Sequence, residues 1–264
     1  MKVSKHPTAL TIAGSDSGGG AGLQADLKVF QVLGVHGSSA VTAITAQNTR
    51  GVTATWPVPG ELVSEQIEAV LSDIGADAVK TGMLHSAPVV DQVAAALRKW
   101  QVKHLVVDPV MMAKGGSPLL QEQGVAALKE KLLPLAEVVT PNTLEAGALT
   151  GLQVDSVAAA REAATRLVAL GARHALVTGG HLPGEPVDVF CDGRHCMELR
   201  SERSPGPPVH GTGCVLSAAL AGYLARGLPI EEAVTRAHSF VGQAIRAAFA
   251  VGGGYPICGL KGEG

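Results

Sequence analysis

The stretch Leu105-Val106-Val107-Asp108-Pro109 places three consecutive apolar residues directly before a carboxylate. A continuous apolar run of this kind is typical of a strand that is buried on both faces, as in a parallel sheet covered by helices on each side. The carboxylate of Asp108 then stands at the tip of the strand. The stretch therefore predicts a buried parallel sheet with a polar group at its carboxyl edge.

On either side of this stretch, short apolar runs alternate with longer helical patterns. The predicted strands are residues 9–13, 39–45, 78–80, 104–107, 138–140 and 175–178, and residues 187–190 and 196–199 are expected to form a hairpin. The predicted helices are residues 23–33, 61–74, 89–100, 124–132, 157–170, 213–225 and 231–248. In residues 213–225, Leu216, Leu220 and Leu224 recur every four residues, as one helical face requires. The alternation predicts parallel βαβ units, and hence one α/β domain over residues 1–264 with a central, mostly parallel sheet flanked by helices on both faces.

The composition supports a folded protein with a large core. Hydrophobic residues make up 46% of the 264 residues and charged residues only 17%, which argues against disorder. Aromatic residues are only 3%, so the core is expected to consist of Ala, Val and Leu. A formal net charge of −2 and the lack of a basic tract argue against nucleic-acid binding. No signal peptide and no apolar run of membrane-spanning length is recognised, so we expect a cytoplasmic protein without a membrane partner.

The four cysteines are expected to be reduced thiols, as is usual in the cytoplasm. Cys191 and Cys196 flank Asp192-Gly193, which is a tight-turn signal, so a hairpin would place both on one face. The C-x4-C spacing with His195 nearby raises the alternative of a zinc site. Because no second ligand pair follows, we favour strand cysteines over a metal site.

The ligand site of a parallel α/β sheet lies beyond the carboxyl ends of its strands, so the residues after each predicted strand are the candidates for function. Residues 14–22 read Gly-Ser-Asp-Ser-Gly-Gly-Gly-Ala-Gly, which resembles a phosphate cradle but lacks the Lys-Ser/Thr pair of a Walker A loop. Either this loop is a flexible connector, or it brings Asp16 and Asp26 to face a substrate.

Two further loops carry groups that suit a flat polar ring. Gln47 offers a donor and an acceptor side by side and can read the edge of an aminopyrimidine or an adenine, although most loop glutamines are only solvated. Met83, in Lys80-Thr81-Gly82-Met83-Leu84, is either an apolar wall for such a ring or core filler. Neither signal is specific by itself.

Three more loops suit phosphate or metal. Asp108 is placed to hold Mg²⁺, directly or through water. Glu145, in residues 140–145, is expected to be a second carboxylate near the metal. In an alternative that does not exclude the first, Glu145 completes a capping box whose cap is Thr140 or Asn142. Thr178 and the backbone amides that follow it are placed to contact an ATP phosphate.

The sequence His210-Gly211-Thr212-Gly213-Cys214 leads directly into an amphipathic helix. A helix start presents unpaired N–H groups and a partial positive charge, and flanking glycines let an anion approach them. The same field is expected to lower the pKa of Cys214 below its free value of about 8.5 and to favour the thiolate. The stretch predicts an anion hole for a transferring phosphoryl group beside Cys214, or alternatively a buried cysteine behind a glycine-rich cap.

Taken together, six ordered stretches resemble the ribokinase superfamily, and closely its hydroxymethylpyrimidine/phosphomethylpyrimidine kinase branch. They are residues 14–22, Thr45-Ala46-Gln47-Asn48, Lys80-Thr81-Gly82-Met83, Asp108-Pro109-Val110-Met111, residues 140–145 and His210-Gly211-Thr212-Gly213-Cys214. The resemblance implies a single ribokinase-like domain and an ATP-dependent kinase of thiamine biosynthesis. It also implies phosphorylation of a hydroxymethyl group and then of the resulting phosphate, with Mg²⁺ as cofactor, and usually a homodimer.

The resemblance also implies a role for each candidate residue. For the substrate, it implies that Gln47 reads the pyrimidine edge, that Met83 and Val110 form walls on the ring, and that Gly14 and Asp26 lie near it. For the nucleotide and metal, it implies that Asn142, Thr178 and Gly180 bind ATP and that Asp108 and Glu145 bind Mg²⁺. For catalysis, it implies that Gly211 and Gly213 form the anion hole beside the catalytic Cys214. Many members of the branch carry Lys in place of Thr178, so this chain is expected to hold ATP phosphates differently. The alternatives are a pyridoxal kinase, a non-catalytic pyrimidine-binding protein and a redox protein that uses Cys214.

Overall fold

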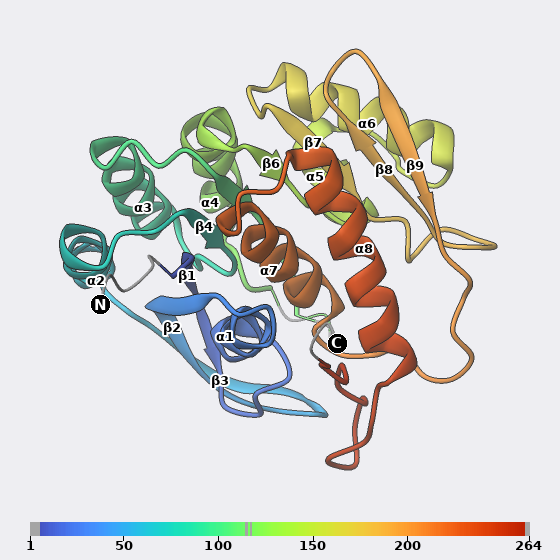
Figure 1. The fold of residues 1–264 in the computed structure, drawn as a ribbon, viewed down its shortest axis with the longest axis horizontal. Helices are drawn as coiled ribbons and strands as arrows, with labels where there is room; N and C mark the ends of the chain where they lie inside the picture. Colours follow the sequence, from blue (N-terminus) through green and yellow to red (C-terminus); the bar gives the residue numbers. More distant parts are fainter. Residues whose placement is uncertain (1–5, 114–115, 117, 262–264) are drawn as a thin grey trace.

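The computed structural model describes residues 6–113, 116 and 118–261 (Figure 1). In this part of the chain, nine strands form one sheet of order β3-β2-β1-β4-β5-β6-β7-β8-β9. The strands are β1 (Thr8–Asp16), β2 (His36–Asn48), β3 (Gly51–Pro57), β4 (Ala78–Thr81), β5 (Leu105–Val107), β6 (Val138–Val139), β7 (His174–Val177), β8 (Val187–Cys191) and β9 (Cys196–Arg200). The strands from β2 to β7 in this order pair in parallel, whereas β3, β8 and β9 are antiparallel to their neighbours. The predicted central, mostly parallel sheet is confirmed.

Helices cover both faces of the sheet, as Figure 1 shows. One face carries α1 (Gly22–Val32), α7 (Thr212–Ala225) and α8 (Ile230–Arg246). The other carries α2 (Gly60–Asp73), α3 (Ala87–Lys99), α4 (Glu122–Ala127), a π-helical turn (Leu128–Leu132), a 3-10 turn (Leu133–Leu135), α5 (Thr143–Thr150) and α6 (Val157–Ala169). Within the described residues, none of the helices combines the length and the apolarity that a membrane span requires.

The central strand β5 shows why its sequence is apolar throughout. Leu105 and Val107 pack into the core on the side of α2 and α3, whereas Val106 packs into the core on the side of α7. Successive side chains of a strand point to opposite faces, so a strand covered on both faces needs apolar residues at every position. Burial of each of these side chains contributes roughly 1.5–3 kcal/mol to the free energy of folding. A charged substitution at Val106 would therefore remove the support for α7.

Two elements differ from the prediction. Strand β3 was not predicted, because it lies at the sheet edge and its residues are exposed or half-buried, so burial imposes no strong pattern on it. It forms a hairpin with β2, which runs on past the predicted end at residue 45 to Asn48. Helix α5 is short, and the sequence signalled only its start.

The expectation that all four cysteines are reduced is wrong for one pair. Cys191 and Cys196 form a disulfide across the β8–β9 hairpin. The two residues are register partners in this antiparallel pair, with their Cα atoms 4.2 Å apart, so the tight turn itself brings the sulfur atoms together. Cys214 and Cys258 are not part of this disulfide.

Candidate active site

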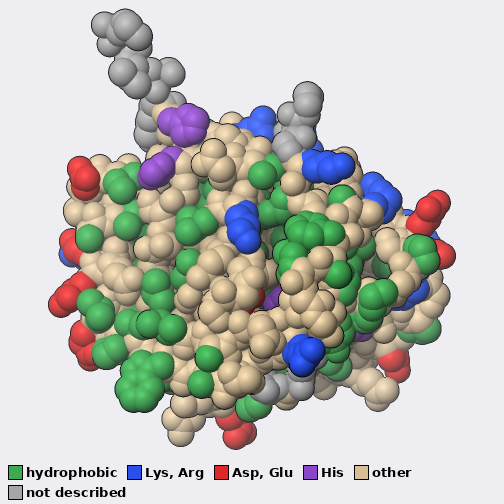
Figure 2. Space-filling model, turned by 90° about the horizontal axis from the view of Figure 1, so that it is seen from below, with side chains coloured by type: hydrophobic (Ala, Val, Ile, Leu, Met, Phe, Trp, Pro, Cys, Tyr) green, Lys and Arg blue, Asp and Glu red, His purple; other side chains and the backbone are tan. Residues whose placement is uncertain are grey.

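Six parallel strands end at one edge of the sheet, and α7 begins at the same edge. Ser217, one turn into α7, donates a hydrogen bond to the carboxylate of Asp108 just after β5 (Oγ–Oδ2 2.8 Å). Seen from this edge, the molecule carries its acidic side chains at the rim, apart from a recessed point near the centre where acidic and histidine atoms show through (Figure 2). The candidate site therefore lies where sheets of this class bind their ligands.

A buried ion cluster lies beneath this edge. Lys80 on β4 places its Nζ 2.9 and 2.8 Å from the two carboxylate oxygens of Asp26 on α1, and 3.9 Å from Oδ2 of Asp108. Thr11 on β1 donates a further hydrogen bond to Asp26 (2.6 Å). Burial alone would lower the pKa of Lys80, but the charges of Asp26 and Asp108 outweigh burial and raise it. Lys80 is therefore a permanent cation inside the fold.

The structure corrects the predicted role of Asp26 as a residue beside the substrate ring. The residue has no exposed surface, and both of its carboxylate oxygens bind Lys80. A carboxylate that shares both oxygens with a buried ammonium has no free edge for a ligand. Asp26 therefore lies beneath the site and stabilises it through its ion pair with Lys80.

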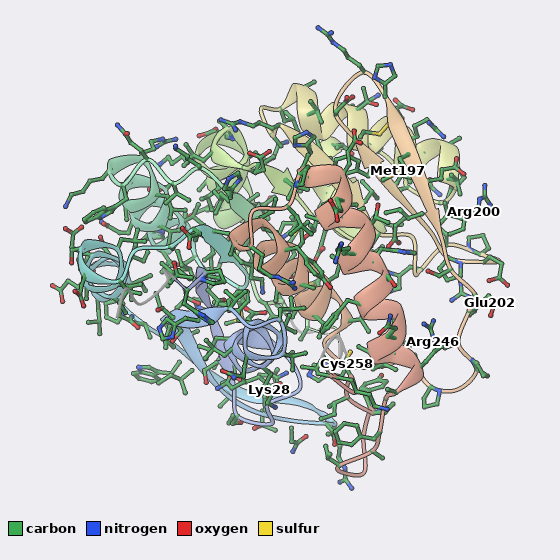
Figure 3. All side chains as sticks on the ribbon, viewed as in Figure 1. Lys28, Met197, Arg200, Glu202, Arg246 and Cys258 are labelled. Atoms are coloured by element: carbon green, nitrogen blue, oxygen red, sulfur yellow. A yellow bond between two sulfur atoms is a disulfide. The ribbon has the colours of Figure 1, made fainter. Side chains whose placement is uncertain are left out.

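The glycine-rich loop of residues 14–22 is neither a phosphate cradle nor a flexible connector. Asp16 is 3% exposed, and its carboxylate accepts hydrogen bonds from the backbone N–H groups of Gly18 (2.8 Å), Gly20 (3.0 Å) and Ala21 (2.8 Å). The amides that a phosphate would need are thus bound to an internal carboxylate. Lys28 on α1, labelled in Figure 3, also donates to the carbonyl of Gly19 (2.7 Å). Asp16 consequently faces into its own loop and not toward a substrate.

Met83 and Gly14 lie in contact at the tips of β4 and β1. A Cβ atom on Gly14 would stand 3.0 Å from Cε and 3.3 Å from Sδ of Met83, so the thioether fills the space above the glycine. The carbonyl of Met83 accepts a hydrogen bond from the buried hydroxyl of Thr42 (2.6 Å). Val110, two residues beyond Asp108, is half-buried at the same edge. These positions suit an apolar wall, and contact with a ring stays a prediction.

Gln47, near the end of β2, is half-buried and held at both ends of its amide. Its Oε1 lies 3.1 Å from the hydroxyl of Thr45, and its Nε2 lies 3.2 Å from Nε2 of His210. His210 is also 3.5 Å from Oδ2 of Asp16. The structure thus links Gln47 to the residue that directly precedes Gly211, at the start of α7.

The start of α7 is open to an anion. Gly211 adopts a left-handed conformation (φ 83°), and a Cβ atom there would overlap the carbonyl of Gly20. Gly213 is exposed, with open space where a side chain would project. No side chain caps the helix start, so the first amides keep the partial positive charge that the sequence predicted.

The predicted lowering of the Cys214 pKa is wrong. Burial raises the pKa of the thiol to about 12, against the opposing charge of Lys80, and the charges of Asp108 and Asp26 raise it further. Burial first, and the two carboxylates second, thus outweigh both the charge of Lys80 and the field of the helix start. Before substrates bind, Cys214 is therefore a thiol.

Asp108 and Glu145 are the two carboxylates predicted to hold a metal, and they are 5% and 8% exposed. Glu145 accepts the N–H of Asn142 (2.9 Å), and Asn142 accepts those of Leu144 (2.9 Å) and Glu145 (3.0 Å), so the capping box is confirmed with Asn142 as the cap. Burial, together with the charge of Asp108, raises the pKa of Glu145 to about 8. A cation bound near both groups would offset the repulsion between the carboxylates of Asp108 and Glu145.

Two buried hydroxyls flank the carboxylates. Thr81 at the end of β4 and Thr140 after β6 lie on either side of the β5 tip, and neither Oγ1 has a hydrogen-bond partner in the described structure. Oxygen atoms around two neighbouring carboxylates fit Mg²⁺, which keeps several waters and takes phosphate oxygens as further ligands. Within residues 6–113, 116 and 118–261, no three His, Cys, Asp or Glu side chains gather as a metal-binding group. Asp108 and Glu145 would therefore hold the ion together with ligands from a bound nucleotide.

The residues predicted to bind ATP lie at the tips of β6 and β7. Asn142 and Thr178 form a parallel bridge, and the N–H of Thr178 donates to the carbonyl of Pro141 (2.9 Å). The N–H of Gly179 donates to the carboxylate of Asp188 on β8 (2.8 Å). Gly180 is exposed, with nothing near the place where its side chain would be. The backbone is thus accessible here, and ATP binding by these residues stays a prediction.

Sequence reasoning missed three residues that shape the site. Lys80 belongs to the motif Lys80-Thr81-Gly82-Met83, but no role was predicted for it. A lysine in a strand that is predicted to be buried nevertheless indicates an ion pair. His210 likewise had no assigned role. Arg203 donates to the carbonyls of Gly180 (3.2 Å), Leu182 (2.7 Å) and Gly184 (2.8 Å) in the loop after β7. No sequence pattern announces contacts to backbone carbonyls, so Arg203 had no signal.

Known proteins match this chain along most of its length. It is 50% identical over 249 residues to the thiamine biosynthesis bifunctional protein ThiED of Geobacter sulfurreducens, covering 94% of this chain and 51% of that protein, so it spans about half of that relative. It is 48% identical over 248 residues to the hydroxymethylpyrimidine/phosphomethylpyrimidine kinase of Streptomyces coelicolor, covering 94% of this chain and 92% of that protein.

Solved structures agree with the fold. The phosphomethylpyrimidine kinase of Clostridium difficile 630 superimposes with a TM-score of 0.81 at 42% identity, over 90% of this chain and 99% of that one. An ADP complex of Bacillus subtilis pyridoxal kinase superimposes with a TM-score of 0.90 at 39% identity, over 96% of this chain and 97% of that one. The ribokinase-like fold is therefore confirmed. Residues 16–258 match the family model described as phosphomethylpyrimidine kinase, and the chain belongs to that family.

Proposed function

We propose that this chain is an ATP-dependent hydroxymethylpyrimidine/phosphomethylpyrimidine kinase of thiamine biosynthesis. The hydroxymethyl oxygen of 4-amino-5-hydroxymethyl-2-methylpyrimidine takes one phosphoryl group from ATP, and the monophosphate then takes a second. The contact between Gln47 and His210 carries this proposal, because His210 directly precedes the start of α7. A ring read by the Gln47 amide would lie beside the amides that attract a phosphoryl group.

The geometry supports catalysis mainly by positioning and charge. Phosphoryl transfer passes through a loose transition state, and fixed positive dipoles stabilise the charge on the transferring group. The exposed amides at Gly213 and Cys214 would supply these dipoles. Mg²⁺, when bound by Asp108 and Glu145 with the nucleotide, would neutralise phosphate oxygens.

Cys214 is proposed to take the proton of the acceptor hydroxyl in the first transfer. A general base of this kind is typically worth ~10²–10⁴-fold. Because the pKa of the thiol lies at about 12, the thiolate is a strong but scarce base, so the first transfer should become faster as the pH rises. The phosphate acceptor of the second transfer is already anionic near neutral pH and has less need of a base.

A coupled ATP assay on hydroxymethylpyrimidine tests the function. We expect ATP-dependent turnover, and phosphorus NMR should show the monophosphate first and the diphosphate later. Binding of the pyrimidine without turnover of ATP would favour a non-catalytic binding protein instead.

Pyridoxal is a second candidate acceptor. The similarity to the Bacillus subtilis pyridoxal kinase, at a TM-score of 0.90, favours it, and pyridoxal also carries a hydroxymethyl group on a flat ring. Parallel measurements of kcat/KM on the pyrimidine and on pyridoxal distinguish the two. We expect the higher value for the pyrimidine, because its edge matches the Gln47 amide.

We also propose that the protein acts as a homodimer. Trp56 (76% exposed) and Ile44 (56% exposed) face each other across β3 and β2 at the open edge of the sheet. Two large apolar side chains at a sheet edge favour association with another surface. Light scattering of the wild type and of Trp56→Ser tests this, and an unchanged dimer in the variant would exclude this edge. A cytoplasmic location stays a prediction from the sequence.

A further inference from the structure

His210 connects the ring-reading end of the site to its phosphate-binding end. The side chain is 13% exposed, and a Cβ atom on Gly20 would lie 2.8 Å from its Cδ2, so the imidazole has little room to turn away. Its backbone N–H donates to the carbonyl of Pro256 (2.8 Å), and its carbonyl accepts from the thiol of Cys258 (3.7 Å), labelled near the start of α7 in Figure 3. The ring is therefore held against Gln47 and Asp16.

The contact between Nε2 of Gln47 and Nε2 of His210 links the orientation of the amide to the position of the ring proton. An amide nitrogen donates and does not accept, so with the Gln47 amide turned as in the structure, Nε2 of a neutral His210 accepts from Gln47 at 3.2 Å and the ring proton is on Nδ1. The same Nε2 lies 3.5 Å from a carboxylate oxygen of Asp16, which only accepts. Asp16 thus favours the opposite state, with the proton on Nε2. Consistent with a proton on Nε2, a hydrogen bond from His210 helps to lower the pKa of Asp16, which burial alone would raise.

Gln47 can satisfy either state by turning its amide by half a turn. With the proton on Nε2 of His210, the amide oxygen takes the place of the amide nitrogen and accepts. At the other end, the hydroxyl of Thr45 lies 3.1 Å from the amide and 2.7 Å from the carbonyl of Ser15. A hydroxyl donates and accepts, so Thr45 serves both orientations. The direction of the amide is thus set by His210 and Asp16 and not by Gln47 itself.

The direction of the amide decides which way round an aminopyrimidine binds. The free edge of the amide offers a donor and an acceptor side by side, and the 4-amino group and the neighbouring ring nitrogen of the substrate match them in one order. The hydroxymethyl group is on the carbon next to the amino-bearing carbon. Reversing the order on Gln47 turns the ring over and moves the hydroxymethyl group to the other side.

We propose that His210 is a positioning residue for the acceptor. Through the place of its ring proton, it holds the Gln47 amide in the order that directs the hydroxymethyl group toward the start of α7. The inference rests on the proposed pyrimidine acceptor, because only a ring with an adjacent donor and acceptor senses this order.

A double-mutant cycle tests the proposal. Gln47→Leu, His210→Leu and the double variant are compared with the wild type in kcat and KM for the pyrimidine at saturating ATP. We expect His210→Leu to lower kcat/KM about 10-fold, partly through kcat, because the ring then also binds in the unproductive direction. The KM for ATP should stay within about twofold. The double variant should be no slower than Gln47→Leu, because without the amide His210 has nothing to orient.

His210→Gln is the conservative control, because its amide reaches the place of Nε2, and it should recover part of the activity lost in His210→Leu. Thermal unfolding checks that each variant is folded, and if His210→Leu is not, the same cycle is run with His210→Gln. Losses that add in the double variant, or an equal rise of KM for ATP and pyrimidine, overturn the proposal. A wild-type enzyme that does not phosphorylate the pyrimidine contradicts the proposed function instead.

Discussion

At the proposed acceptor end of the site, buried side chains bind one another. Asp16 binds three amides of its own loop, and Lys80 joins Asp26 to Asp108 without exposure to water. At the proposed nucleotide end, beyond β6 and β7, a loop is held through its main chain, because Arg203 donates to three of its carbonyls. The first arrangement depends on particular charges, whereas the second depends on the shape of the backbone.

This difference bears on Thr178, which carries no charge at a position proposed to contact ATP phosphates. If ATP phosphates are bound mainly by backbone amides, the loss of one side-chain charge is tolerated provided that the loop keeps its shape. At the acceptor end no such tolerance is expected, because an unpaired charge in the interior is strongly destabilising. Substitutions at the two ends should therefore have effects of different size and kind.

The largest effect is expected from Lys80→Met. This change leaves the carboxylates of Asp26 and Asp108 buried without their cation, which should lower the free energy of unfolding by ~3–5 kcal/mol. Denaturant unfolding measures the loss. Lys28→Met is the matched control, because its ammonium binds an exposed carbonyl, and it should change stability by less than about 1 kcal/mol. Equal losses of stability in the two variants would show that the buried ion cluster of Lys80 contributes no more than the exposed contact of Lys28.

Cys214→Ala should separate the two transfers. We expect the first phosphorylation to slow by ~10²-fold or more and the second by much less, because only the first acceptor must lose a hydroxyl proton. Single-turnover rates with the hydroxymethylpyrimidine and with its monophosphate measure each step. Equal losses in both steps would show that Cys214 serves another purpose than proton removal.

Gln47→Leu should weaken the binding of the pyrimidine by ~1–3 kcal/mol, because polar ring atoms are left without partners. Calorimetry measures this loss, and the affinity for ATP should not change, which keeps the effect at the acceptor end. Gln153→Leu, at an exposed position away from the site, is the control. An unchanged affinity in Gln47→Leu would refute the edge-reading role.

Glu145→Gln should alter how stability depends on pH. The pKa of Glu145 is about 8 in the fold and about 4.3 in the unfolded chain, so between these values the folded state binds more protons and stability falls as the pH rises. The variant lacks this fall and keeps an acceptor for the capping box. It should gain on the order of 2 kcal/mol over the wild type at pH 8 and little at pH 4. Parallel stability curves for the two proteins would contradict the raised pKa.

Arg203→Ala should have the smallest effect and should be confined to the nucleotide end. Without the guanidinium, the loop after β7 loses its hold, and the KM for ATP should rise about fivefold, which corresponds to ~1 kcal/mol. The KM for the pyrimidine should stay constant. Arg200→Ala is the control, because its guanidinium pairs with Glu198 at the surface. A rise in both KM values would show that the two ends are not independent.

The sequence was sufficient to predict the sheet, because burial on both faces leaves a continuous apolar run such as Leu105–Val107. It was insufficient for the edge strand β3, which is held by backbone pairing and not by burial. The covalent pairing of Cys191 with Cys196 depended on the exact register of the hairpin, and their tight-turn spacing alone did not decide it.

Within the site, the order of motifs predicted which residues gather at the carboxyl edge, but not which of them face a ligand. Asp16 and Asp26 look alike in the sequence as acidic residues near glycines, yet both are bound by internal groups. The Cys214 pKa was predicted in the wrong direction because the helix field is local to the motif, whereas the burial of the thiol and the charges of Asp108 and Asp26 depend on distant parts of the chain. Such long-range charge balance depends on tertiary structure.

The backbone at Gly211 lies against the backbone of Gly20, so that a Cβ atom at position 211 would overlap the Gly20 carbonyl. A displacement of the loop of residues 14–22 toward Gly211 would therefore also move the start of α7. Any side chain at position 211 would force this loop and the helix apart, and no substitution at position 20 could compensate, because the overlapping atom is a backbone carbonyl.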